Sequence, residues 1–150
     1  MNGQFIHDSS RTPGAKAALS GIARGVLYIW ACPATIIGLC TAGMALVTGG
    51  SVRVVEGVLE VEGGLVRFIL ARCTPLRGGA SAMTLGHVVI ARDRKLLDST
   101  RTHERVHVRQ CERWGPLFIP AYFAASFLAW ARGQRPYMDN HFEREAYELE

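Results

Sequence analysis

Residues 103–107 of the chain read His103-Glu104-Arg105-Val106-His107, with a glutamate directly after the first of two histidines. By composition alone, a chain of this length would contain such an HExxH pattern with a probability on the order of one per cent. Residues i and i+4 share one face of a helix, so both imidazoles could bind one Zn²⁺ ion at about 2.0 to 2.1 Å. Glu104 would then lie to one side, near a water molecule on that ion.

A helix through this motif would place the two histidines on its inner face. At about 100° per residue, His103 and His107 share a face with Gln110, Cys111 and Trp114. An arginine stripe at i, i+4 spacing lies on the other face, at Arg101, Arg105, Arg109 and Arg113. The pattern therefore favours inward-facing histidines over two polar residues of a solvated helix that happen to flank a glutamate.

Two histidines do not complete a catalytic zinc site, which usually has a third protein ligand and an open position for water. The longer HExxHxxGxxH motif is absent, because Gln110 and Arg113 stand where it would continue. A glutamate on a following helix is the other common solution, and residues 142–147 supply one. Glu143 also has the spacing of a capping box with Asn140, which would be purely structural. The remaining candidate ligands are Glu145, His141 and His87.

Length and composition indicate one folded domain. The chain has 150 residues, of which 49% are apolar and 20% charged, and its net charge is +4. These values exclude a disordered chain and make a two-domain enzyme improbable. The cysteines lie far apart in the sequence, which excludes a cysteine-rich zinc module and a dense disulfide scaffold. They are Cys32, Cys40, Cys73 and Cys111.

Two uncharged segments raise the mean hydropathy to +0.11. No charge lies between Arg24 and Arg53, and residues 21–48 are predicted to form a transmembrane helix that follows a flexible polar tail, residues 1–20. A cleaved signal peptide and a buried core helix are the alternatives. The second uncharged segment, residues 114–131, is predicted to be a second span, an interfacial helix or a core helix. The charges on either side do not settle an orientation.

Residues 51–150 are predicted to form an α+β domain with a small antiparallel sheet. Strands are expected at 52–54 and 58–61, followed by a hairpin turn at Gly63-Gly64 into a strand at 65–70, and by a third strand at 84–90. A helix capped by Ser99 or Thr100 should then run to Trp114, where Gly115-Pro116 ends it. The last helix is expected after Pro136, with Asp139 or Asn140 as its cap.

The motif at 103–107, together with the later Glu143-Arg144-Glu145-Ala146, resembles the gluzincins in a minimal form. Residues 84–147 are similar to a group of small, largely uncharacterised bacterial membrane-associated proteins with HExxH followed by ExxA. The resemblance implies a zincin-like fold in which His103, His107 and Glu143 bind zinc. It also implies that the strand before the active helix borders the cleft and pairs with extended substrate. Tyr147 replaces the aspartate of the family motif, and its hydroxyl could contact substrate instead.

These residues predict a membrane-associated zinc metallopeptidase that acts on a peptide or protein substrate. Glu104 would serve as the general base for a zinc-activated water. The oxyanion donor is left open among Tyr147, Tyr137, His141 and Arg144. The predicted location is a membrane, and the resemblance implies the bacterial inner membrane.

Two alternatives lie outside catalysis. The first is a non-catalytic membrane module in which zinc holds helices together, and the second is a module that binds anionic lipid through the arginine stripe. Nucleic acid is not an expected partner, because aromatic residues are not interleaved with those arginines. The sequence leaves the oligomeric state open.

Overall fold

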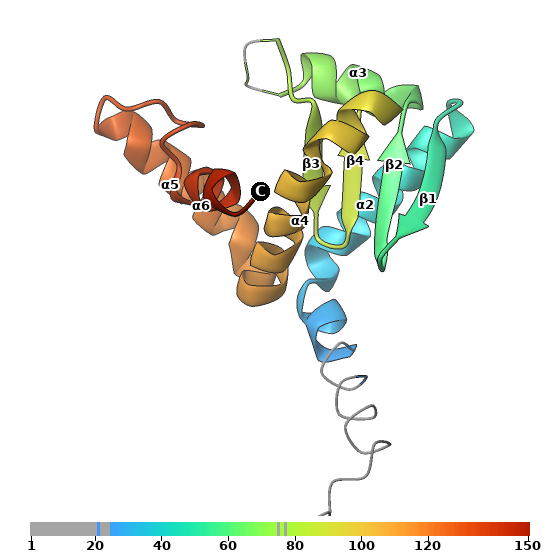
Figure 1. Ribbon diagram of the computed structural model, residues 1–150, viewed down its shortest axis with the longest axis horizontal. Coiled ribbons are helices and arrows are strands. Elements are labelled where there is room, and N and C mark those ends of the chain that lie inside the picture. Colours follow the sequence, from blue (N-terminus) through green and yellow to red (C-terminus); the bar gives the residue numbers. More distant parts are fainter. Residues whose placement is uncertain (1–20, 22–24, 75, 77) are drawn as a thin grey trace, which may run out of the picture.

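The computed structural model describes residues 21, 25–74, 76 and 78–150, which form an α+β structure around a four-stranded sheet (Figure 1). The strands are β1 (Ser51–Val55), β2 (Val58–Glu62), β3 (Ala82–Leu85) and β4 (Val88–Ala91), in the spatial order β1-β2-β4-β3. The α+β prediction is confirmed. The predicted antiparallel sheet is wrong, because β2 and β4 pair in parallel and the sheet is mixed. The predicted tail lies outside the described residues.

The parallel pair exists because residues 65–70, predicted as a strand, form part of helix α3 (Gly64–Arg72). Val66 and Leu70 are its buried residues, one helical turn apart. A short apolar run does not by itself distinguish a strand from a helix, and here the helical period prevails. Because α3 carries the chain away from the end of β2, β4 can return beside β2 in the same direction.

The predicted single strand at 84–90 is instead the hairpin of β3 and β4, which reverses at Gly86-His87. Gly86 has a φ of 65°, and a Cβ there would lie 2.2 Å from the Thr35 hydroxyl oxygen. That hydroxyl accepts a hydrogen bond from the His87 backbone amide at 3.2 Å. The close approach of α2 (Cys32–Val47) therefore requires glycine at this turn.

Helices cover both faces of the sheet, and the alternation of the strands sorts their side chains into two cores. Helices α2 and α3 pack on one face, in a cluster made of Ala42, Ala45, Val61, Val66, Leu70, Ala80, Val88 and Ile90. Helix α4 (Arg94–Trp114) packs on the other, in a cluster made of Val58, Val89, Ala91, Leu97 and Val108. The HExxH helix is therefore fixed against the sheet by its own apolar residues.

Helix α2 lies close to the sheet through small residues. A Cβ at Gly38 would lie 2.5 Å from the Val88 Cβ, so only glycine permits this packing distance. The outer side of α2 exposes Ile36, Ile37 and Leu39. A separate helical stretch covers residues 25–30, and a turn at Ala31 separates it from α2.

The described part of 21–48 is thus not one continuous helix. At 16 residues, α2 is shorter than the roughly 20 residues that a membrane span needs. Its position in a membrane stays a prediction.

Helix α4 begins earlier than predicted. Asp93 caps it, accepting a hydrogen bond from the Leu96 amide at 2.9 Å. The predicted caps, Ser99 and Thr100, lie inside the helix and donate their hydroxyls to the Leu96 carbonyl. The predicted end is confirmed at Gly115, whose φ is 55°. The chain continues through the short 3-10 helix η1 (Gly115–Leu117) into α5 (Phe118–Ala131).

The final helix, α6 (His141–Leu149), is held by its cap residue. Asn140 accepts from the Phe142 amide at 2.9 Å, as one of the two predicted caps. Its side-chain amide donates to the Tyr122 carbonyl at 3.1 Å and to the Ser126 hydroxyl at 2.8 Å, both on α5. Asn140 is completely buried. It therefore fixes the start of α6 against α5.

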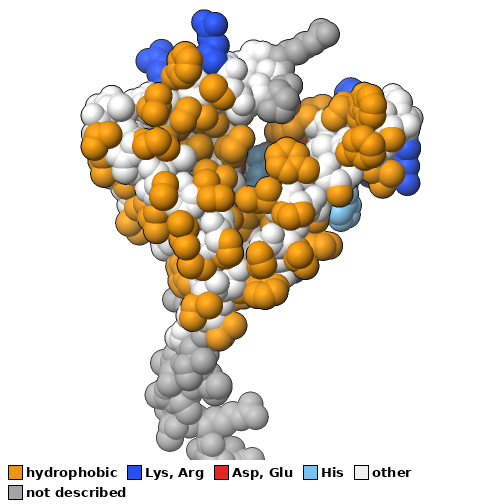
Figure 2. Space-filling view, turned by 180° about the vertical axis from the view of Figure 1, so that it is seen from behind, with side chains coloured by type: hydrophobic (Ala, Val, Ile, Leu, Met, Phe, Trp, Pro, Cys, Tyr) orange, Lys and Arg blue, Asp and Glu red, His pale blue; other side chains and the backbone are white. Residues whose placement is uncertain are grey.

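The continuous helical segment Arg94–Ala131, comprising α4, η1 and α5, is long and apolar enough to cross a membrane by length and composition. Its charged residues all lie in α4, and residues 114–131 carry none. Viewed from behind, apolar side chains cover most of the surface, which is hollowed at one place (Figure 2). Exposed apolar residues of α2 and α5 include Ile36, Ile37, Leu39, Phe123, Phe127 and Trp130.

Candidate metal centre

The fold brings the three predicted ligands together. His103 and His107 project from α4 and Glu143 from α6, and the atoms they offer all lie within 4.8 Å of one another. None of the three residues has more than 7% of its surface exposed. Among the described residues this is the one group of three metal-binding side chains. We call it the metal cluster.

Three distances define the metal cluster. Nε2 of His103 lies 3.2 Å from Oε2 of Glu143, and Nε2 of His107 lies 3.4 Å from Oε1. The two Nε2 atoms are 3.2 Å apart. Ligands at 2.0 to 2.1 Å from a tetrahedral metal ion would be separated by about 3.3 to 3.4 Å. Each separation is near that value, although the two histidines face different oxygens of Glu143; with one ligand atom from each residue, the three atoms lie within 4.8 Å of one another.

The tautomer of His107 follows from its neighbours. Its Nδ1 lies 2.8 Å from Oε1 of Gln110. The amide nitrogen of Gln110 donates to the Phe142 carbonyl at 3.0 Å and to Glu145 at 2.8 Å. Because both amide hydrogens of Gln110 have acceptors, its oxygen faces the imidazole and Nδ1 of His107 carries a proton.

His103 has the same arrangement. Its Nδ1 lies 3.0 Å from a carboxylate oxygen of Glu150, which can only accept from it when ionised. In the neutral form of both histidines, Nε2 is then an acceptor that faces the Glu143 carboxylate. In that form no donor lies between the two Nε2 atoms and Glu143, and a proton on one imidazole or a metal cation would satisfy them.

The charges in the metal cluster reinforce one another. Burial would raise the pKa of Glu143, but hydrogen bonds from the two histidines and from the Tyr122 hydroxyl lower that pKa to about 2. Tyr122 donates to Oε1 at 2.6 Å. Burial lowers the pKa values of His103 and His107, but the Glu143 carboxylate outweighs it and the net pKa of each is raised. The carboxylate thus attracts positive charge to the centre.

Glu104 lies beside the metal cluster and is only 5% exposed. The hydroxyl oxygen of Thr84, on β3, lies 2.7 Å from Oε2 of Glu104 and 3.1 Å from its backbone carbonyl. Burial raises the pKa of the Glu104 carboxyl. A carboxylate with a raised pKa is suited to accept and return a proton near neutral pH.

Comparisons with protein-family models, with curated proteins and with solved structures gave no match for this chain. The resemblance to gluzincins therefore rests on the motif residues, and membership of that family stays a prediction. The convergence of His103, His107 and Glu143 is independent of that resemblance.

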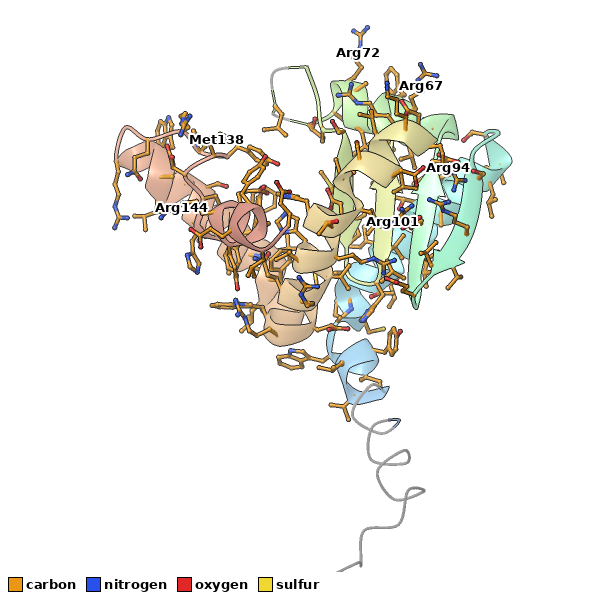
Figure 3. The ribbon with its side chains drawn as sticks, viewed as in Figure 1. Arg67, Arg72, Arg94, Arg101, Met138 and Arg144 are labelled. Carbon is orange, nitrogen blue, oxygen red and sulfur yellow. The ribbon has the colours of Figure 1, made fainter. Side chains whose placement is uncertain are left out.

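Of the other candidate residues on α6, one lies near the metal cluster and three lie outside it. Tyr147 is near the metal cluster, with its ring centroid 4.7 Å from that of His103 and 43% of its surface exposed. Glu145 lies outside it and pairs with Arg113 at 3.0 Å. His141 is exposed, and Arg144, labelled in Figure 3, is exposed on the same helix. The capping-box alternative for Glu143 is not realised, because both its carboxylate oxygens face the histidines.

Sequence reasoning gave no functional role to Tyr122, Thr84 or Glu150. Tyr122 and Ser126 are the hydroxyl-bearing residues of the apolar helix α5, and they are four residues apart. Both contact residues at the start of α6. Two polar residues at i and i+4 in an apolar segment share one face of a helix, and this pattern could have predicted a polar contact there. Thr84 and Glu150 carried no comparable signal.

Half of the arginine stripe is engaged inside the molecule. Arg101 projects from α4 toward β2 (Figure 3) and donates from Nε to the buried Glu60 carboxylate at 2.8 Å. Arg105 donates to the Val55 carbonyl at 2.6 Å. Arg113 pairs with Glu145, as described above, and Arg109 is exposed. These contacts leave little of the stripe for a lipid surface.

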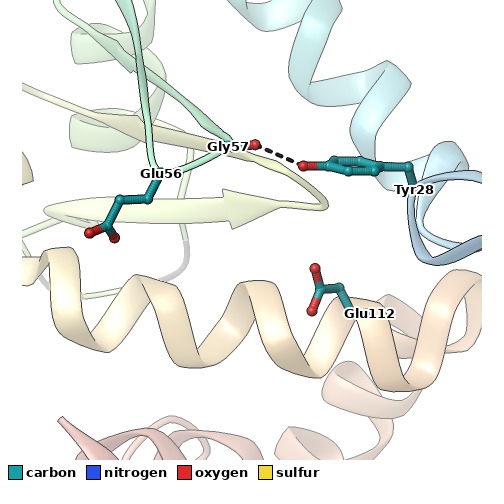
Figure 4. A pocket seen from close by; sticks show the side chains of 4 residues that line it. All are labelled: Tyr28, Glu56, Gly57 and Glu112. Carbon is teal, nitrogen blue, oxygen red and sulfur yellow. Dashed lines mark hydrogen bonds between the residues drawn. The ribbon is translucent and has the colours of Figure 1, made fainter. Parts of the chain in front are cut away.

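A separate cavity of about 300 Å³ lies near the β1–β2 turn, lined by Tyr28, Glu56, Gly57 and Glu112 (Figure 4). The Tyr28 hydroxyl donates to the Gly57 carbonyl at 3.2 Å. His87, a remaining ligand candidate, belongs to this region, because its Nε2 lies 3.1 Å from Glu112 and its ring packs on Tyr28. The structure does not bring His87 to the metal cluster.

Proposed function

We propose that the protein is a membrane-associated, zinc-dependent metallopeptidase. The observation that carries this proposal is the convergence of the two Nε2 atoms and the Glu143 carboxylate, whose ligand atoms lie within 4.8 Å of one another, with Glu104 beside them. An imidazole and carboxylate ligand set suits zinc, and such a set leaves a position for water.

Each side chain of the proposed site has a distinct role. His103, His107 and Glu143 hold the ion, and Tyr122 orients the Glu143 carboxylate. When bound, zinc polarises the scissile carbonyl and lowers the pKa of a water molecule. Glu104 takes a proton from the attacking water and delivers it to the leaving amine. The Thr84 hydroxyl holds that carboxylate in place.

The substrate is proposed to align along β3. This strand is at the edge of the sheet, with β4 on its other side, and Thr84 links it to Glu104. An extended peptide could add to the free edge by backbone hydrogen bonds. The sequence predicted that substrate would pair along residues 84–90. The strand directly before the active helix, β4, lies inside the sheet, so the edge offered to an extended peptide is β3. Tyr147, partly exposed beside His103, is positioned to contact such a peptide.

Membrane association is proposed from the exposed apolar surface. Residues 25–52 and 114–131 carry no charge. Within the described part of these segments, apolar side chains such as Ile29, Val47 and Phe127 are each more than 60% exposed. A soluble domain seldom leaves so many large apolar side chains exposed to water. We propose that this surface lies against membrane lipid and that the membrane is the bacterial inner membrane.

Metal content tests the site. We expect the purified full-length protein to hold close to one zinc ion per chain, and His103→Ala and Glu143→Ala to lose it. His141→Ala is the matched control, because His141 is exposed at the start of α6 and is not one of the three converging residues. Zinc retained in both ligand variants, or absent from the wild type, would contradict the proposal.

One observation favours a second function, a structural zinc site in a non-catalytic module. The three ligands are more than 90% buried, as in sites that only stabilise a fold. Glu104→Gln separates the two functions, because it removes the general base and leaves all three ligands. A metallopeptidase would keep its zinc and lose about 10²- to 10⁴-fold in peptide hydrolysis. A structural site would show no hydrolysis in the wild type to lose.

Vesicle binding tests the location. The full-length protein should co-sediment with vesicles of neutral lipid, and 0.5 M salt should not release it, because apolar contact is insensitive to screening. Binding only to anionic vesicles, reversed by salt, would instead favour the arginine stripe.

A further inference from the structure

Helix α6 contacts the histidines on the side away from the metal-binding atoms, as well as through its ligand Glu143. Glu150, directly after α6, lies 3.0 Å from Nδ1 of His103. Glu145 accepts a hydrogen bond from Gln110, and Gln110 in turn accepts from Nδ1 of His107. One short helix therefore reaches both imidazoles from behind.

The contact to His103 is direct and carries a charge. An ionised Glu150 can only accept, so it fixes the proton on Nδ1 and leaves the Nε2 lone pair toward the centre. A carboxylate acceptor also makes the imidazole more basic and a stronger metal ligand. Glu150 has 41% of its side chain exposed. Among the described residues, its hydrogen bond with Nδ1 of His103 is the one that links it to the buried cluster.

The contact to His107 is relayed through a neutral amide. Gln110 is 2% exposed and has only one orientation in which both ends are satisfied. Glu145 and the Phe142 carbonyl fix that orientation by accepting from the amide nitrogen, and Arg113 pairs with Glu145 at 3.0 Å. If Gln110 turned over, its amide would face the Nδ1 proton and His107 would lose its acceptor.

We propose that Glu150 and the Glu145–Gln110 pair are positioning residues that set the tautomer and orientation of the two metal-binding histidines. This inference rests on the proposed metal site. It adds Glu150 and the Glu145–Gln110 pair, none of which belongs to the ligand motif, as residues that orient the ligands. Removing such a partner typically weakens metal affinity by about 10- to 100-fold. Glu150 should have the larger effect, because it acts directly and with a full charge.

The test measures zinc affinity by competition with a chelator in the full-length protein. Glu150→Ala should bind zinc about 10- to 100-fold more weakly than the wild type, and Glu150→Gln, which keeps an acceptor oxygen, should recover part of the loss. Glu145→Ala should weaken binding by a smaller factor. Glu148→Ala is the matched control, because Glu148 is exposed on the same helical turn and contacts none of these residues.

Two further measurements distinguish positioning from a general loss of structure. The visible spectrum of the cobalt-substituted protein should change in Glu150→Ala and stay unchanged in Glu148→Ala, because it reports ligand geometry. Thermal unfolding of the metal-free protein should be the same in both variants.

Wild-type affinity and an unchanged cobalt spectrum in Glu150→Ala would overturn this inference and leave the metal site intact. Absence of metal from the wild type would overturn the proposed function and the inference with it.

Discussion

Helix α4 carries two buried clusters of charged groups on opposite sides, and they differ in how their charges are balanced. Toward the sheet, the Glu60 carboxylate receives Arg53 at 2.7 Å and Arg101 at 2.8 Å, with Arg105 at 3.7 Å. We call this group the closed cluster, because every oxygen of Glu60 has a donor from the protein. Toward α6, the metal cluster presents acceptors that face one another.

The closed cluster stabilises the fold, whereas the metal cluster is suited to bind a ligand. In the closed cluster, the guanidinium groups lower the pKa of Glu60 even though burial would raise it. Nothing further is needed to satisfy that carboxylate. In the metal cluster, three side chains on two helices converge so that a proton or, as proposed, a metal ion would complete them. The same helix thus contributes one cluster that fixes it to the sheet and another that remains available for a ligand.

The largest expected contrast is in the pH dependence of zinc binding. Because the pKa values of His103 and His107 are raised above 6.5, protons compete with the metal as pH falls through neutrality. Two competing protons would weaken zinc affinity by up to about 100-fold per pH unit below those pKa values. Chelator competition at pH 7.5 and 5.5 measures the loss.

The closed cluster should not respond over the same interval. The pKa of Glu60 is lowered from 4.5, so its contribution to stability is fully present above that value and is lost only as pH falls below it. The loss of stability caused by Glu60→Ala, measured by denaturant unfolding of the metal-free protein at the two pH values, provides the comparison and should be the same at both. A zinc affinity that is flat between pH 7.5 and 5.5 would contradict proton competition at the histidines.

The next contrast is in folding stability. Glu60→Ala should lower the free energy of unfolding by roughly 2 to 3 kcal/mol, because Arg101 and Arg53 lose their buried partner and keep only the exposed Asp98. Each of these side chains is about one third exposed, which keeps the loss at the lower end of the range for buried pairs. Denaturant unfolding of the metal-free protein measures it.

Glu143→Gln should destabilise the metal-free protein less at neutral pH, because glutamine has nearly the same shape and still offers an oxygen and an amide to the two imidazoles and the Tyr122 hydroxyl. An equal or larger loss in that variant would show that both clusters are primarily structural.

How far the sequence could predict each cluster depends on the range of the contacts. The histidine pair, the end of α4 at Gly115 and the Asn140 cap were predictable, because each depends on residues within about one helical turn. The strand predicted at 65–70 failed because Leu65 to Leu70 is a short apolar run that suits either period. Glu60, Thr84 and Glu150 reach α4 from 20 to 47 residues away, and no local pattern records such a pairing.

A smaller effect is expected at Thr84, which satisfies Glu104 as the arginines satisfy Glu60. Thr84→Val removes the hydroxyl and keeps the shape, so the Glu104 carboxylate loses one hydrogen bond of about 1 to 1.5 kcal/mol. Peptide hydrolysis should fall by roughly 10-fold in kcat, with KM and zinc content unchanged. Thr84→Ser, which keeps the hydroxyl, should retain most of the activity. Equal losses in the two variants would indicate that packing at β3 matters and the hydrogen bond does not.

The smallest effect is expected at Arg109, an exposed member of the arginine stripe. Arg101 is committed to the closed cluster, whereas Arg109 is exposed and makes no ion pair within the described residues. Arg109→Ala should therefore change the free energy of unfolding by less than about 0.5 kcal/mol, and Arg101→Ala by several times more. Denaturant unfolding of both variants measures this ratio. Equal effects would mean that the stripe acts as one solvated surface and that the contacts of Arg101 with Glu60 contribute little to stability.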